Sequence, residues 1–205
     1  MPMRDIEFYF DFGSPNAYFV HKVLPGLAER AGARALWKPV LLGGSFKATG
    51  NQSPMMAFGQ VKGKLAYEQR EIERFVKKHL LTEYQFNPHF PVNSLLMMRG
   101  AIFAEREGML SAYVDACFSA MWETGQAMAD PDVVRQVLDG AGLNGAAILE
   151  WAQEPAVKEA LKERTEEAVA RGLFGVPTIF VGDEMFFGKE RLGQIEDHLL
   201  AAKSG

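Results

Sequence analysis

A serine between an apolar run and a proline is the first residue whose position suggests chemistry. The segment FYFDFGSPNAYF, residues 8–19, leaves a strand-like stretch at Gly13 and continues with Ser14-Pro15. Serine followed by proline is typical of a helix start, where the hydroxyl caps free N–H groups. The same N–H groups and the helix dipole favour a negative charge. Ser14 is therefore either only a cap or also a hydrogen-bond donor to a bound anion.

Ser14 is a poor nucleophile but a suitable donor. A serine nucleophile needs a base within hydrogen-bond reach, and His21 lies about two turns farther along the expected helix. The surrounding residues also lack the G-x-S-x-G pattern of α/β-hydrolases. A hydroxyl beside a helix N-terminus suits a thiolate, because such a setting can lower a thiol pKa from about 8.5 toward neutrality. The single cysteine, Cys117, lies in an apolar helical run and should be inert, so the sulfur must come from a ligand.

The segment GLFGVPTIF, residues 172–180, is the second candidate. In one interpretation Pro177 merely opens an edge strand. In the other, the Val176–Pro177 bond is cis and turns the backbone N–H and C=O of Val176 outward, ready to pair with an extended peptide. The residues alone leave both interpretations open.

Other candidates are weaker. His79 and His89 are separated by a proline-containing loop and match no metal-ligand pattern, so we expect no metal. Arg99 could bind a substrate carboxylate, or it could be solvated or paired with an acidic residue. Four aromatic side chains could wall an apolar pocket or belong to the core: Phe12, Trp122, Phe186 and Phe187.

The elements that must position these residues follow from the apolar pattern. Residues 5–12 and 34–42 read as buried strands on either side of a helix that runs from Pro15 to a stop at Gly32, with a kink expected at Pro25. Short joints of this kind predict a βαβ unit with parallel strands.

The rest of the chain divides into a helical block and a final hairpin. Residues 57–172 are helical in pattern almost throughout, and 177–187 read as an antiparallel hairpin that turns near Gly182, followed by an amphipathic helix. This order predicts the α/β class: a thioredoxin-like fold with a large all-helical insertion domain. We expect a discontinuous thioredoxin-like domain at 1–56 and 173–205, and an inserted helical domain at 57–172.

Composition limits the possible partners. The 205 residues are 48% hydrophobic and 23% charged, with a net charge of −4 and no basic block, so nucleic acid is not expected as a partner. No apolar stretch approaches the roughly 20 residues that span a membrane, and the acidic N-terminal run does not resemble a secretory signal. We therefore expect a cytoplasmic protein that does not bind membranes.

The chain resembles the 2-hydroxychromene-2-carboxylate isomerases and the related kappa-class glutathione transferases, within the wider DsbA-type oxidoreductases. The matching segments are FYFDFGSPNAYF, KGKLAY, FPVNS, AYVDACFSAMW and FGVPTIFVGDEMFFGKERL. The resemblance implies a thioredoxin domain with a helical insertion, a cis-proline loop, glutathione as the cofactor and a homodimer. It places Ser14 where the oxidoreductases keep their first cysteine, so that Ser14 would bond the glutathione sulfur. Val176, preceding Pro177, would pair with the glutathione backbone.

The resemblance also implies further contacts with glutathione. Asn51 and Lys62 match positions that contact the cofactor, with Lys64 as the alternative lysine. The family pattern Gly-x-Asp-Arg corresponds here to residues 188–191, so Lys189 and Glu190 fall in the cofactor segment, and Glu190 replaces the usual aspartate near the γ-glutamyl ammonium. The residues expected at an aromatic carboxylate substrate are Phe12, Arg99, Trp122 and Phe187.

By this resemblance the protein would be a glutathione-dependent isomerase that adds a thiolate reversibly to a conjugated aromatic keto acid. Three alternatives compete with it. A transferase would release the adduct, and a non-catalytic thioredoxin-like module would bind peptides at the Val176–Pro177 loop. A disulfide oxidoreductase is the weakest alternative, because residues 14–17 contain no sulfur.

Overall fold

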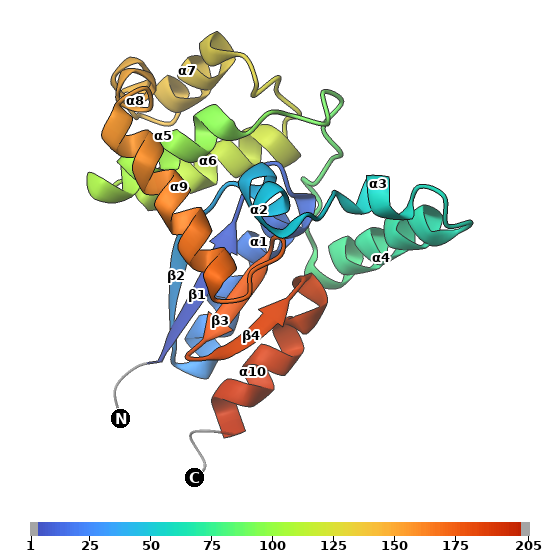
Figure 1. The fold of residues 1–205 in the computed structure, drawn as a ribbon. Helices are drawn as coiled ribbons and strands as arrows, with labels where there is room; N and C mark the ends of the chain where they lie inside the picture. The colour runs from blue at the N-terminus through green and yellow to red at the C-terminus, as the bar shows by residue number, and fades with distance from the viewer. Residues whose placement is uncertain (1–3, 202–205) are drawn as a thin grey trace.

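A four-stranded mixed sheet forms the centre of the thioredoxin-like part of this computed structural model, which describes residues 4–201 (Figure 1). Its strands are β1 (Asp5–Phe10), β2 (Arg34–Pro39), β3 (Thr178–Val181) and β4 (Glu184–Phe187), in the spatial order β2-β1-β3-β4. Strand β1 is parallel to β2 and antiparallel to β3, which is antiparallel to β4. The predicted βαβ unit, hairpin and mixed sheet are confirmed.

The first helix has the ends that the sequence predicts. Helix α1 (Pro15–Ala31) follows Ser14 and stops at Gly32, whose φ of 57° is the left-handed conformation that glycine adopts readily. The helix continues through Pro25. The two parallel strands, by contrast, end two or three residues earlier than predicted, at Phe10 and Pro39.

Helices surround the sheet and extend well beyond it. They are α2 (Leu42–Thr49), α3 (Pro54–Phe58), α4 (Lys64–His79), α5 (Leu95–Arg106), α6 (Leu110–Trp122), α7 (Pro131–Gly140), α8 (Gly145–Trp151), α9 (Pro155–Ala170), the short 3₁₀ helix η1 (Lys189–Arg191) and α10 (Leu192–Ala201). Helices α5 to α8 form a block above one end of the sheet, while α3 and α4 project to one side (Figure 1). Among residues 4–201, no helix is long and apolar enough to cross a membrane.

Strand β1 contributes to two separate cores, one on each face of the sheet. Phe8 and Phe10 belong to the main core, which they share with α1, α5 and α6. Tyr9, between them, belongs to a smaller cluster with Phe180 of β3 and Ala168 of α9. Burial on both faces explains why nearly every position of this strand is apolar.

Helix α2 departs from the sequence pattern, which predicts a strand to residue 42 and a helical block only from residue 57. Gly43 and Gly44 in its first turn have low helix propensity. Long-range contacts hold the start of this helix instead: the Leu41 N–H donates to Thr165 Oγ1 at 3.0 Å and the Leu42 N–H donates to Asp11 Oδ2 at 2.8 Å. Residue 57 itself falls inside α3, and the domain boundaries stay predictions.

Candidate functional site

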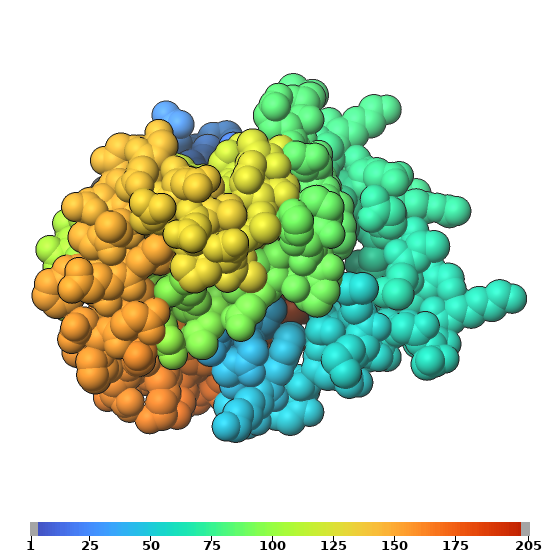
Figure 2. All heavy atoms as spheres, turned by 90° about the horizontal axis from the view of Figure 1, so that it is seen from above, coloured from blue at the N-terminus to red at the C-terminus, as the bar shows by residue number. Residues whose placement is uncertain are grey.

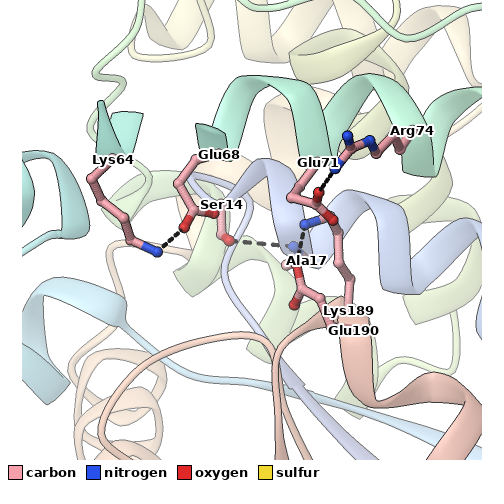
Figure 3. Close-up of polar contacts among 8 residues, drawn as sticks. All are labelled: Ser14, Ala17, Lys64, Glu68, Glu71, Arg74, Lys189 and Glu190. Carbon is pink, nitrogen blue, oxygen red and sulfur yellow. Dashed lines mark hydrogen bonds and ion pairs between the residues drawn. The ribbon is translucent and has the colours of Figure 1, made fainter. Parts of the chain in front are cut away.

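Ser14 and Val176 meet at the start of α1, although 162 positions separate them in the chain. Ser14 is the N-cap: its Oγ accepts a hydrogen bond from the Ala17 N–H at 3.2 Å (Figure 3). The same oxygen donates to the carbonyl oxygen of Val176 at 3.5 Å. The Val176–Pro177 peptide bond is cis. The structure thus brings together the two segments that the sequence singled out.

The Ser14 hydroxyl has a weak acceptor. O–H···O bonds in proteins usually span about 2.5–3.0 Å, so the bond of 3.5 Å to the Val176 carbonyl is long. A charged acceptor forms a shorter and stronger hydrogen bond than a carbonyl does. The hydroxyl proton of Ser14 could therefore turn to an anion at the start of α1, while its oxygen continues to accept from Ala17.

The cis-proline loop is tied to the segment after the hairpin. The Pro177 carbonyl accepts a hydrogen bond from the Gly188 N–H at 3.0 Å. Lys189, which follows, is only 2% exposed; its ammonium pairs with the Glu190 carboxylate and lies 5.8 Å from the ring centre of Phe75 on α4. The Glu190 side chain is 48% exposed. This contact leaves a half-exposed carboxylate paired with a buried ammonium.

Helix α4 presents further charges to the same region. Lys64 pairs with Glu68, and Glu71 pairs with Arg74 (Figure 3). Glu68 is the main cause that raises the pKa of Lys64, and Glu190 adds a smaller effect. Figure 3 shows this row of side chains on the side of α4 that faces Ser14 and the Lys189–Glu190 segment. The region is therefore rich in charges of both signs.

The two other predicted cofactor residues lie in exposed positions. Asn51 comes two residues after the end of α2, and its backbone N–H donates to the Phe46 carbonyl at 3.1 Å. Lys62 lies in the exposed turn before α4, and its side chain forms no ion pair or hydrogen bond with any residue in 4–201. Lys64, the alternative, is half-buried and belongs to the charged row on α4.

Phe12 and Trp122 do not wall a pocket in this structure. Both are 0% exposed, and the Trp122 Nε1–H donates to the Phe12 carbonyl at 2.9 Å. Trp122 ends α6, so this bond fastens the helical block to the loop that precedes Ser14. We assign both residues to the core, which was the alternative interpretation of their sequence.

The remaining predicted substrate residues are accessible. Phe187 is 40% exposed and packs on Phe174, with ring centres 4.5 Å apart. Phe174 lies two residues before Val176, so this exposed aromatic pair adjoins the cis-proline loop. Arg99, in the first half of α5, is half-buried, and its guanidinium has no ion pair or hydrogen bond among residues 4–201. The ion-paired alternative for Arg99 is therefore excluded within the described chain.

A buried carboxylate that the sequence reading missed lies directly before the candidate site. Asp11 is 0% exposed, and its two oxygens accept from the Gly13 N–H and the Leu42 N–H, each at 2.8 Å. The Ser94 hydroxyl lies near the same carboxylate. Burial raises the pKa of Asp11, and the three donors partly oppose that effect. An acidic residue inside the apolar run FYFDF was the available signal, because such burial requires compensating donors.

Two cavities described in the structure are lined by residues away from Ser14. One, of about 380 Å³, is lined by Arg4, Asp5, Glu7, Val181 and Gly182. The other, of about 210 Å³, lies between α1 and α6 and includes His21 in its lining. Both ring nitrogens of His21 are engaged there, with Trp37 Nε1 at 3.2 Å and Asp115 Oδ1 at 3.1 Å. His21 therefore does not serve Ser14 as a base.

The surface of the molecule seen from above is hollowed at one place. In the space-filling view from above, a gap separates the green residues that lead into α5 from the cyan residues of α2 and α3 (Figure 2). Dark red atoms of the C-terminal part of the chain lie deep in this gap. Three segments that are distant in sequence thus border one hollow.

Comparison with known proteins supports the thioredoxin-like fold. The model of the DSBA-like thioredoxin domain matches residues 5–200. The chain belongs to the DSBA-like thioredoxin family. A 2-hydroxychromene-2-carboxylate isomerase from Sphingobium xenophagum is 30% identical over 199 residues, which cover 96% of this chain and 98% of that protein. A solved structure of a 2-hydroxychromene-2-carboxylate isomerase is also 30% identical and superposes with a TM-score of 0.82. The alignment covers 95% of this chain and 94% of the solved chain.

A more distant relative also matches nearly the whole chain. Glutathione S-transferase kappa 1 from Homo sapiens is 26% identical over 218 residues, which cover 98% of this chain and 92% of that protein. The resemblance and the thioredoxin-like fold expected from the sequence are therefore confirmed. The roles of the individual site residues remain predictions.

The thiol of Cys117 should be unreactive in the folded protein. Cys117 is 0% exposed, and burial raises its pKa to about 12, so the nucleophilic thiolate is scarce at neutral pH. Incubation with a thiol-specific disulfide reagent at pH 8 should release no chromophore on the scale of minutes, whereas the same protein in denaturant should release one equivalent. Rapid reaction of the folded protein would show that the chain can supply its own reactive sulfur.

Proposed function

We propose that this protein is a glutathione-dependent isomerase that interconverts forms of a conjugated aromatic keto acid, of the 2-hydroxychromene-2-carboxylate type. The observation that carries the proposal is the Ser14 hydroxyl, which caps α1 and has only a long bond to the Val176 carbonyl. A donor at a helix N-terminus favours an anion. Relatives named 2-hydroxychromene-2-carboxylate isomerase support this choice of reaction.

The residues around Ser14 suit an extended, zwitterionic tripeptide. Glutathione carries two carboxylates and one ammonium group besides its thiol. With the sulfur at Ser14, its backbone would pair with Val176, its carboxylates would meet the Lys64 side chain, and its ammonium would meet Glu190. The acidic and basic groups on α4 and η1 supply both signs of charge within one region. Asn51, after α2, would contribute an amide to the same ligand.

Lys64 is the lysine that we propose for the cofactor. Its ammonium pairs with Glu68 and lies 5.4 Å from the ring centre of Phe58 on α3. Besides Glu68, the charge of Glu190 also contributes to raising the pKa of Lys64. Lys62 points from an exposed turn and has none of these partners. A half-buried cation beside the other charged groups is better placed to hold a carboxylate than an exposed one.

The chemistry divides between cofactor and protein. When bound, glutathione would supply a thiolate that adds reversibly to the conjugated double bond of the substrate, which permits rotation, and then leaves unchanged. Ser14 would hold the sulfur by donating a hydrogen bond from its hydroxyl, and the dipole of α1 would stabilise the negative charge. Val176 orients the tripeptide through its backbone. Arg99, without a partner in the described chain, would attract the substrate carboxylate, and Phe187 with Phe174 would contact its aromatic ring.

A glutathione transferase is the second candidate function, favoured by the similarity to glutathione S-transferase kappa 1. The two functions use the same bound thiolate and differ in its fate, because a transferase releases the adduct. For either one we place the protein in the cytoplasm, where glutathione is kept reduced. We expect a homodimer with a small aromatic carboxylate as substrate.

An assay with 2-hydroxychromene-2-carboxylate distinguishes these functions. Conversion to trans-o-hydroxybenzylidenepyruvate, followed by absorbance, should require glutathione in catalytic amount and leave its concentration unchanged. S-methylglutathione, which keeps the charges but lacks the thiol, is the matched control and should not support turnover. Loss of glutathione in step with product would favour the transferase. Equal turnover with and without glutathione would contradict both proposals.

Replacing Ser14 with alanine should weaken the stabilisation of the bound thiolate. The expected loss in kcat/KM is about 1.5–3 kcal/mol, or about 10- to 150-fold, the scale of a hydrogen bond to a charged group. The thiol pKa of bound glutathione, titrated by thiolate absorbance, should rise. Asn144→Ala is the control, because Asn144 also caps a helix by accepting from the N–H three residues on, at 3.0 Å, but lies in the helical block. Identical titrations of wild type and Ser14→Ala would leave Ser14 as a cap only.

A pair of lysine variants tests which side chain binds the cofactor. Lys64→Met should raise the KM for glutathione by about 2- to 5-fold with little change in kcat, because a partly exposed ion pair contributes only modestly to binding. Lys62→Met removes the same charge two residues earlier and should change the KM by less than about 2-fold. Steady-state kinetics at varied glutathione concentration measures the KM of both variants. A larger increase for Lys62→Met than for Lys64→Met would assign the cofactor contact to Lys62.

A further inference from the structure

Asp11 is a buried titratable group to which the proposed reaction assigns no role. Its side chain has no exposed surface, and donors occupy both oxygens. A ligand therefore cannot reach this carboxylate directly. Any effect of Asp11 on the site must act through the groups that it holds.

Those groups belong to three different segments, each of which leads to a candidate site residue. The Gly13 N–H, in the loop between β1 and α1, immediately precedes Ser14. The Leu42 N–H begins α2, which ends shortly before Asn51. The Ser94 hydroxyl stands at the start of α5, which carries Arg99.

Asp11 stabilises the turn that carries Ser14 with both its side chain and its backbone. The Asp11 carboxylate accepts from the Gly13 N–H, and the Asp11 carbonyl accepts from the Ser14 N–H at 3.1 Å. The packing is tight: a Cβ on Gly13 would lie 3.3 Å from Asp11 Oδ1 and 3.7 Å from Ser94 Oγ. Glycine at position 13 therefore allows Asp11 and Ser94 to approach the turn closely.

We propose that Asp11 is a positioning residue for the reaction at Ser14. Its carboxylate fixes the Ser14 turn against the first residue of α2 and the start of α5. The Ser14 hydroxyl, the N-terminus of α1 and the cofactor segment after α2 therefore keep fixed positions relative to one another. This inference rests on the proposed function. It predicts that Asp11 acts through Ser14, which a purely structural role does not require.

The test is a double-mutant cycle with Asp11→Asn and Ser14→Ala. Asparagine has the shape of aspartate but one acceptor oxygen, so one of the two backbone N–H donors would face an amide NH₂ group. In the wild-type background kcat should fall by about 10-fold or more, the effect of a small misplacement of reacting groups, while the KM for the aromatic substrate changes little. In the Ser14→Ala background the same change should cost less than about 2-fold, because the group being positioned is already absent.

Two further variants make the cycle decisive. Thr165→Val removes a buried acceptor from the Leu41 N–H, one residue before Leu42, and should lower the melting temperature without changing kcat. Ser94→Ala removes only the hydroxyl that lies near Asp11, and it replaces Asp11→Asn in the cycle if that variant does not fold. The smaller effect of Ser94→Ala on kcat should also disappear in the Ser14→Ala background.

The outcomes are distinguishable. If the wild type has no glutathione-dependent turnover, the proposed function fails, and the role of Asp11 in that reaction fails with it. If the wild type turns over but the losses from Asp11→Asn and Ser14→Ala multiply, only the positioning role is overturned. A gain of activity in Asp11→Asn would also overturn it, by showing that the negative charge of Asp11 opposes the thiolate.

Discussion

A carboxylate without access to water must be surrounded by hydrogen-bond donors, and in this protein that requirement determines how the candidate site is assembled. Asp11 follows a strand that is buried on both faces, so its side chain has no route to solvent. Its donors come from the Ser14 turn, from α2 and from the start of α5. The Asp11 carboxylate thus lies where these three segments come together. The groups that satisfy this buried carboxyl therefore include the turn that carries Ser14.

The charged side chains around Ser14 form ion pairs, and a zwitterionic ligand could take the place of one partner in such a pair. Lys64 with Glu68 and Glu190 with Lys189 are pairs in which at least one member is partly exposed. Such pairs contribute little to stability, so a ligand can replace one partner without unfolding the site. The buried ammonium of Lys189 is different, because it is held beneath Glu190 and against Phe75. In this pair, therefore, only the Glu190 carboxylate is accessible to solvent.

The thiol chemistry proposed for the site does not involve the chain's own cysteine. Cys117 is buried in α6 with a pKa of about 12, whereas the start of α1 carries a hydroxyl donor at the positive end of a helix. The thiolate that we propose for this site must therefore come from a ligand. The similarity to glutathione S-transferase kappa 1 supports glutathione as that ligand.

The sequence by itself determined those features that depend on neighbouring residues: the Ser14-Pro15 helix start, the stop at Gly32, the βαβ unit and the final hairpin. Local signals suffice there, because capping, backbone conformation and apolar periodicity act over a few residues. The tertiary structure alone decided that Ser14 meets Val176, that Phe12 and Trp122 lie in the core, and that α2 forms despite its two glycines. Each of these depends on contacts between residues far apart in the chain, and no local pattern specifies which distant group will satisfy a buried donor or acceptor.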